Sequence, residues 1–157
     1  MTNIVLDRID KHILKLMQNN GRITNLELAD QIGLSPTPCS RRVKRLEASG
    51  LIEGHVTLLS AESLGLNLTA IISISMDRHT PDRFEAFEAA IIKIPEVIEC
   101  SIVTGQSADF LLKAVVKDMQ HYEKFLLGNL TRLDGVSGVH TSFVLRHLIK
   151  KTALPVD

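Results

Sequence analysis

The chain has 157 residues, of which 45% are hydrophobic and 23% charged, a composition that suits one mid-sized globular domain or two small ones. No stretch approaches the roughly 18 consecutive apolar residues of a membrane span, and the N-terminus lacks a secretory signal pattern, so we expect a cytoplasmic protein with no membrane partner. Cys39 and Cys100 are isolated from one another, which argues against a CxxC metal site or a disulfide framework. Both are expected to be small buried residues.

The net charge is zero, yet the charges are unevenly distributed along the chain. The residues up to Ser60 carry eight basic and six acidic side chains, whereas the remainder carries ten basic and twelve acidic ones. Four basic residues and no acid lie between Thr37 and Leu46. Nucleic-acid binding requires a basic patch on the contacting face, and this distribution is compatible with one.

The first fifty residues predict three short helices. Leu6, Ile9, Ile13 and Leu16 recur at spacings of three and four, which is typical of one buried helix stripe ending near Gly21. A second helix begins at a capping box formed by Thr24 and Glu27, and Gly33 ends it. A third begins with Ser35 as N-cap and Pro36 in its first turn, and continues to about Gly50. Two short helices joined by a tight turn predict a helix-turn-helix, winged-helix-like DNA-binding domain over residues 1–50.

The third helix has one apolar face and one polar, basic face. At about 100° per residue, Cys39, Val43 and Leu46 share the face that must be buried. The candidate DNA contacts are the polar and basic residues of this segment: Ser35, Thr37, Ser40, Arg41, Arg42, Lys44 and Arg45. We expect Thr37, Ser40 and Arg41 near base edges, because the start of a recognition helix reaches deepest into the major groove of double-stranded DNA. Lys44 and Arg45 are expected at phosphates, and Arg42 in either a DNA contact or a surface ion pair.

The second half of the chain alternates strand and helix patterns. Residues 51–67 predict a short strand, Leu51–Leu59, followed by a linker, and residues 68–157 predict a separate domain. Its elements follow the order βαββαβ: strand Thr69–Asp77, a helix opened by Thr80 and Pro81, strands Glu96–Thr104 and Asp109–Lys117, a helix from Tyr122 to Leu133, and strand Val136–Leu148. This order predicts an α+β fold of the ferredoxin-like type, with helices on one face of an antiparallel sheet. The other face would carry Ile71, Val103 and Val115, or their neighbours, among polar residues, and such a half-apolar face favours self-association into at least a dimer.

These residues resemble the Lrp/AsnC family, the feast/famine regulators of bacteria and archaea. The resemblance covers nearly the whole chain and depends on Leu6–Asp10, Gly21–Ile23, Gly33–Cys39, Arg42–Glu47 and Gly50–Ile52, followed by Val103–Gly105 with Asp109–Leu112. It implies a transcriptional regulator whose second domain binds free amino acids between subunits and assembles dimers into octamers.

The same resemblance implies effector-site candidates in one loop: Thr104, Gly105, Gln106, Ser107, Ala108 and Asp109. Gly105 permits close backbone approach, the free amides of a hairpin can hold a carboxylate, and Asp109 could accept an ammonium group. The alternative from the residues alone is a plain hairpin turn in which Asp109 is solvated. Ala108 with the flanking Val103 and Phe110 favours an apolar amino acid such as leucine or methionine. No other cofactor and no metal are expected.

Three other functions compete with that of an effector-binding transcriptional regulator: those of an enzyme, an RNA-binding protein and an architectural DNA-binding protein. The histidines form no metal-binding pair and the chain has no GxSxG, P-loop or GxGxxG motif, so an enzyme is not expected. RNA binding by the βαββαβ domain would need stacking aromatic residues, of which the two middle strand patterns offer only Phe110. An architectural DNA-binding protein without an effector would use the same DNA-facing residues.

Overall fold

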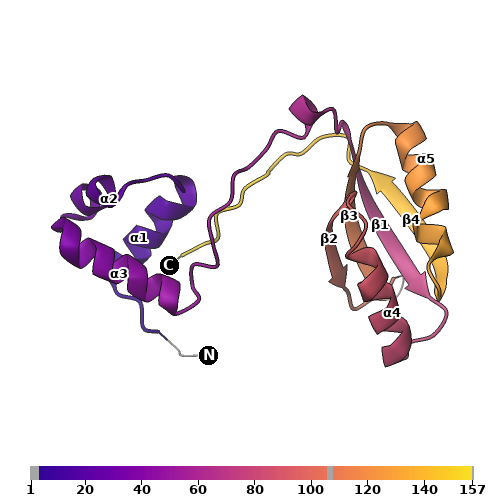
Figure 1. Cartoon of the computed structure of the whole chain (residues 1–157), viewed down its shortest axis with the longest axis horizontal. Helices are drawn as coiled ribbons and strands as arrows, with labels where there is room; N and C mark the ends of the chain where they lie inside the picture. Colours follow the sequence, from indigo (N-terminus) through magenta and orange to yellow (C-terminus); the bar gives the residue numbers. More distant parts are fainter. Residues whose placement is uncertain (1–3, 106–107, 157) are drawn as a thin grey trace. The chain divides into compact units, whose positions relative to one another are not determined.

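The structure, a computed structural model, describes residues 4–105 and 108–156 of the chain. Contacts divide it into two units, one of residues 4–58 together with 149–156, and one of Leu59–Leu148 (Figure 1). We had expected the second domain to extend to Asp157, whereas contacts group residues 149–156 with the first unit. Within the described ranges, no helix has the length and apolar character that crossing a membrane requires.

The first unit contains three helices, α1 (Arg8–Asn19), α2 (Asn25–Ile32) and α3 (Pro36–Ala48). Two reciprocal capping boxes start the first two helices, one between Asp7 and Asp10 and the other between Thr24 and Glu27. The second confirms the sequence prediction, and the first was not foreseen. The helices enclose a core in which Ile13, Cys39 and Leu46 are fully buried, as their spacing predicted.

The second unit is a four-stranded antiparallel sheet with two helices, and it confirms the predicted ferredoxin-like fold. The strands lie in the order β2-β3-β1-β4, and α4 and α5 cover one face of the sheet (Figure 1). In chain order the elements are the 3-10 turn η1 (Glu62–Leu64), β1 (Leu68–Met76), α4 (Pro81–Ile91), β2 (Val97–Ile102), β3 (Phe110–Val116), α5 (Met119–Gly128), the 3-10 turn η2 (Leu130–Arg132) and β4 (Val136–Phe143).

Alternation along the strands separates the two faces of this sheet. In β1, Ala70, Ile72, Ile74 and Met76 are buried beneath the helices, while the intervening residues are partly exposed on the open face. The strand β3 follows the same rule and places Phe110 at 0% exposure between Phe84 and Phe87. The core therefore lies between the helices and the sheet, and the open face of the sheet remains available to solvent or to a partner.

Two strand predictions were wrong. Within the part of the chain that the structure describes, Leu51–Leu59 forms no strand, because a strand needs a hydrogen-bonded neighbour and its apolar alternation does not supply one. The strand predicted over Val136–Leu148 ends at Phe143, since its partner β1 begins at Leu68 and the ladder closes at the pair Ala70 and Phe143.

Cys100 of the second unit also lies in surroundings other than those predicted. Cys100, expected to be buried, is exposed because β2 is an edge strand, although partial burial and then Glu88 raise the pKa of its thiol. Val103 follows the end of β2 and donates its N–H to the carbonyl of Asp109 at 3.0 Å.

Candidate DNA-binding surface and effector loop

The turn between α2 and α3 positions the recognition helix. Gly33 adopts a left-handed conformation with φ of 68°, and the N–H of Leu34 donates to the carbonyl of Ala29 at 2.9 Å, which closes the end of α2. Glycine suits this position because other L-residues pay a steric cost there. Ser35 then occupies the N-cap of α3 with Pro36 in the first turn, as predicted, although the Ser35 side chain makes no capping hydrogen bond within the described residues.

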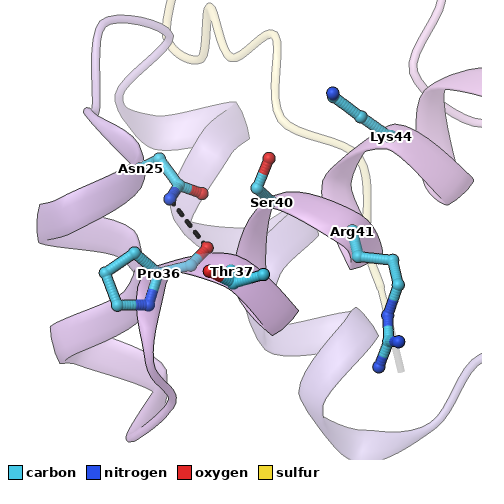
Figure 2. Close-up of a pocket in the computed structure, with 6 residues that line it drawn as sticks. All are labelled: Asn25, Pro36, Thr37, Ser40, Arg41 and Lys44. Carbon is cyan, nitrogen blue, oxygen red and sulfur yellow. Dashed lines mark hydrogen bonds between the residues drawn. The ribbon is translucent and has the colours of Figure 1, made fainter.

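The outer face of α3 forms one wall of a shallow hollow together with the start of α2 (Figure 2). The side-chain amide of Asn25 donates to the carbonyl of Pro36 at 2.9 Å and so ties α2 to the first turn of α3. Sequence reasoning did not single out Asn25, because this bond joins two helices whose separation the local pattern does not reveal. The residues that line the hollow are Asn25, Pro36, Thr37, Ser40, Arg41 and Lys44.

The polar groups of this face suit contact with a duplex. Thr37, Arg41 and Lys44 are exposed, and Ser40 is partly so. Arg41 and Lys44 point in different directions from α3 (Figure 2). Among the described residues, no ion pair engages either of these two cations. Four of the seven predicted DNA contacts therefore lie together on one accessible surface.

Arg42 and Arg45 are instead engaged by two acids of the first helix. Nη1 of Arg42 lies 2.7 Å from Oδ2 of Asp7 and 2.8 Å from Oδ1 of Asp10, and Nη2 of Arg45 pairs with Oδ2 of Asp10. Arg42 thus takes the ion-pair alternative that the sequence left open. Arg45 was expected at a phosphate, and its pairing with Asp10 depends on contact between two helices that the helical wheel of α3 could not show.

Asp10 is a fully buried carboxylate, with 0% of its surface exposed. Burying a charge is costly unless partners compensate it, and here two guanidinium groups and the N–H of Asp7 do so. The backbone N–H of Asp10, followed by the Arg42 guanidinium, holds the pKa of Asp7 below its ordinary value of 3.8. The Asp7 and Asp10 carboxylates in turn raise the pKa of Arg42. A pattern of Asp at positions three apart at a helix start could have signalled the capping box but not these ion pairs.

The loop proposed for the effector lies between β2 and β3. Of its predicted site residues, Thr104 and Gly105 are exposed, Ala108 and Asp109 are partly buried, and Gln106 and Ser107 lie outside the described residues. The alternative of a plain turn with a solvated Asp109 is wrong, because the carboxylate is partly buried and engaged within the second unit. Oδ2 of Asp109 accepts from the backbone N–H of Met76 at 2.7 Å, so the carboxylate helps to hold the end of β1.

His79 completes the surroundings of this carboxylate. Its Nε2 lies 2.8 Å from Oδ1 of Asp109, and its ring packs edge-on against Phe84 with ring centroids 6.2 Å apart. Both oxygens of Asp109 therefore have partners within the second unit. His79 is thirty positions away in the chain, so no spacing in the sequence could have paired it with Asp109.

The open face of the sheet carries no described aromatic ring on its two central strands. β1 and β3 are the central strands, and Phe110 of β3 lies in the core beneath the helices. Ile71, Leu111 and Val115 face the open side among serines, Thr69 and Lys113. Base stacking needs aromatic side chains on such a face, so the geometry disfavours the RNA-binding alternative.

Comparison with protein families also divides the chain into two domains, although the second matched segment extends past Leu148 into residues that contacts group with the first unit. Residues 6–53 match the model of a winged helix-turn-helix DNA-binding domain, and residues 69–154 match the Lrp/AsnC ligand binding domain. The two matched segments contain the hollow on α3 and the loop at Asp109, respectively.

Several characterised proteins are similar to the chain over almost its whole length. The leucine-responsive regulatory protein of Salmonella typhimurium is 44% identical over 151 residues, which cover 96% of this chain and 92% of that protein. The protein of the same name from Escherichia coli K12 is 43% identical over the same shares. A solved complex of a Neisseria meningitidis transcriptional regulator with L-Met has a TM-score of 0.93 and 42% identity, covering 98% of both chains. An AsnC family transcriptional regulator from Agrobacterium tumefaciens has a TM-score of 0.90 and 30% identity, covering 96% of this chain and 97% of its own.

Proposed function

The chain belongs to the Lrp/AsnC family of DNA-binding transcriptional regulators, and from that premise we propose that it binds specific DNA sequences through α3 and responds to a free apolar amino acid. The observation that carries the DNA assignment is the exposed polar face of α3, on which Arg41 and Lys44 lie clear of the ion pairs described above. A recognition helix needs cations for phosphates and short donors for base edges, and this face offers both.

We assign separate roles to the residues of this face. Thr37, Ser40 and Arg41 would contact base edges in the major groove, because they lie on the first turns of the helix. Lys44, one turn further along, would neutralise a phosphate. Ser35 at the N-cap is placed to meet the DNA backbone as the helix enters the groove. Arg45 is half-exposed, with 49% of its side chain accessible, and its role is treated separately below.

Substitution of the two free cations tests the DNA assignment. Arg41→Ala should weaken the free energy of binding to the preferred sequence by about 1–3 kcal/mol and relax specificity at the base pair that Arg41 contacts. Lys44→Ala should weaken binding to all sequences and lower the salt slope by about one unit. Fluorescence anisotropy with duplexes selected from a random pool measures both, and Gln31→Ala, an exposed change on α2, is the control. Unchanged affinity and slope in both folded variants would refute this assignment.

The effector proposal depends on the loop of residues 105–109, which leads into the start of β3. Its exposed backbone near Gly105 could supply amide donors for a carboxylate. Asp109 could share its His79-facing oxygen with an α-ammonium group, whereas its other oxygen remains occupied by Met76. Phe110 is buried and lines, with Ile91 and Ile102, a hollow on the helix side of the sheet, so Ala108 and a second subunit would have to supply apolar contacts at the loop itself. The L-Met complex of the Neisseria relative supports an apolar amino acid, leucine or methionine, as the effector.

Calorimetric titration of the full chain with each of the twenty amino acids tests this proposal. We expect heat with leucine or methionine, and a loss of that heat in Asp109→Asn, which removes the negative charge and keeps an acceptor for Met76. Effector coupling of about 1–3 kcal/mol would appear as a change in DNA affinity of roughly 5–150-fold. If no amino acid gave heat, the architectural alternative, DNA binding without an effector, would replace the sensor proposal.

We also propose that the chain forms at least a dimer, and from dimers an octamer, through the open face of the sheet. Dimerisation would present two recognition helices to successive major grooves, about 34 Å apart. Ile71→Glu places a charge in the centre of that face and should shift the sedimentation coefficient of the full chain toward that of a monomer. Leu127→Glu, which alters an exposed position on α5, is the control and should leave it unchanged. A parent chain that sediments as a monomer at tens of micromolar would exclude this assembly.

A further inference from the structure

Asp10 of α1 and Asp7, the N-cap of α1, neutralise two of the four basic residues on the recognition helix. The cluster of Asp7, Asp10, Arg42 and Arg45 contains two carboxylates and two guanidinium groups, which together carry no net charge. Asp10 contacts both arginines at once and is completely buried, so it has no room to turn toward solvent. The basic residues of α3 therefore fall into two groups: Arg42 and Arg45 are held in ion pairs, whereas Arg41 and Lys44 are not.

The position of each arginine on α3 shows what this pairing does to the DNA-facing surface. At about 100° per residue, Arg41 lies about 40° from Thr37, Arg45 about 80° and Arg42 about 140° around the helix. Arg42 thus faces α1, where 27% of its side chain is accessible. Arg45 lies at the border of the recognition face with 49% accessible, and its long side chain could reach a neighbouring phosphate if Asp10 did not hold it.

We propose that Asp10 is a positioning residue of the DNA-binding unit: it withholds Arg45 from the DNA backbone and thereby limits sequence-independent affinity. This inference rests on the proposed function of α3. Phosphate contacts supply essentially all of non-specific binding, while base contacts supply discrimination. Removing one cation from the phosphate-binding set consequently raises the ratio of specific to non-specific affinity, which is what a regulator needs among many competing sites. Asp7 assists by accepting a hydrogen bond from Nη1 of Arg42, the same nitrogen that Asp10 contacts.

The test measures binding of the full chain to a short duplex of randomised sequence between about 50 and 200 mM salt, where the slope reports the phosphates contacted. Arg45→Gln in the parent chain should leave the slope unchanged, whereas Lys44→Gln should lower it by about one unit. Asp10→Asn, which keeps the shape of the side chain and removes its charge, should raise the slope by about 0.9 and tighten binding roughly five- to tenfold near 0.1 M salt. In the double variant Asp10→Asn with Arg45→Gln, the gain should disappear.

The chain offers a matched control for the charge itself. Glu47 is an exposed acid of α3 that lies about 80° from Thr37 on the opposite side of the face from Arg45. Glu47→Gln removes the same charge at the same angular distance and should raise the slope by less than Asp10→Asn. Equal effects of the two changes would mean that only the overall charge matters, and the proposal would be overturned.

Other outcomes also decide the question. If Arg45→Gln lowered the slope as Lys44→Gln does, or if Asp10→Asn weakened binding, Asp10 would present Arg45 to DNA, contrary to the proposal. If circular dichroism shows that Asp10→Asn does not fold, the salt slopes of Arg45→Gln and Lys44→Gln still decide whether Asp10 withholds Arg45 from DNA or presents it. A parent chain without salt-dependent binding, unaffected by Lys44→Gln, would instead refute the proposed function of α3 as a whole.

Discussion

The side chain of Gln18 in α1 holds the backbone of Leu154 by two hydrogen bonds. Its amide oxygen accepts from the N–H of Leu154 at 2.6 Å, and its amide nitrogen donates to the Leu154 carbonyl at 3.1 Å. Val156, two residues further on, packs against the apolar core of the first unit. The segment after β4 therefore packs against the DNA-binding unit. Lys150 and Lys151 belong to this segment, so their positive charges are part of the same unit.

Loss of this attachment should destabilise the first unit. Gln18→Ala removes both hydrogen bonds and is expected to cost about 1–2 kcal/mol, and a chain ending at Lys151 should lose more because Val156 also leaves the core. Hydrogen exchange should accelerate in α1–α3 and remain unchanged in α4 and α5. Gln31→Ala serves as the control, since exposed substitutions of this kind cost less than about 0.5 kcal/mol. Equal protection in Gln18→Ala and the parent would show that the attachment carries no stability.

The stability of the first unit should depend on pH through Asp7. Because the pKa of folded Asp7 is below its ordinary value of 3.8, its stabilising effect is fully present above that value and is lost as the pH falls through the folded pKa. Asp7→Asn keeps an effective N-cap and removes the charge that Arg42 contacts. We expect thermal melting curves of the two chains to differ at pH 6 and to converge as the pH falls below the lowered pKa of folded Asp7. A difference that persists in acid would assign the effect to capping instead of charge.

Gly33 should tolerate substitution poorly because of its backbone conformation. Its φ of 68° is a left-handed value, so Gly33→Ala is expected to cost about 1–2 kcal/mol although open space surrounds the position. Gly33→Asn should cost less, because Asn adopts this conformation more readily. Gly21 also has open space but lacks a positive φ, so Gly21→Ala is a matched control that should be neutral. Urea unfolding followed by circular dichroism gives all three values, and equal costs for Gly33→Ala and Gly21→Ala would contradict the argument.

Asp109 should matter to the fold as well as to the effector. Asp109→Ala leaves the N–H of Met76 without its acceptor beside a buried side chain, which is expected to cost about 1–3 kcal/mol. Asp109→Asn keeps an acceptor oxygen and should cost less, which is why it is the better probe of effector binding. Amide exchange at Met76 separates the two effects: it should accelerate strongly in Asp109→Ala and only slightly in Asp109→Asn.

Much of the architecture could be predicted from the sequence, because it depends on interactions within a few residues. The capping box of Thr24 and Glu27 joins residues three apart, and Gly33 ends α2 through its own conformation. Strict alternation identified the buried face of β1, since successive side chains of a strand point to opposite sides. The order of strands and helices then indicated the ferredoxin-like sheet, and the polar face of α3 indicated the DNA-binding surface.

What the tertiary structure decided depends on groups that are far apart in the chain. Arg45 looks like a free cation on a helical wheel, and only the packing of α1 against α3 places Asp10 beside it, thirty-five positions away. Asp109 looks like a solvated turn residue until β1 and His79 meet its two oxygens. Leu51–Leu59 has the pattern of a strand, yet among the described residues it pairs with no neighbouring strand. Local periodicity determines which face of an element is buried, whereas the partner that each polar group finds there depends on how distant elements pack.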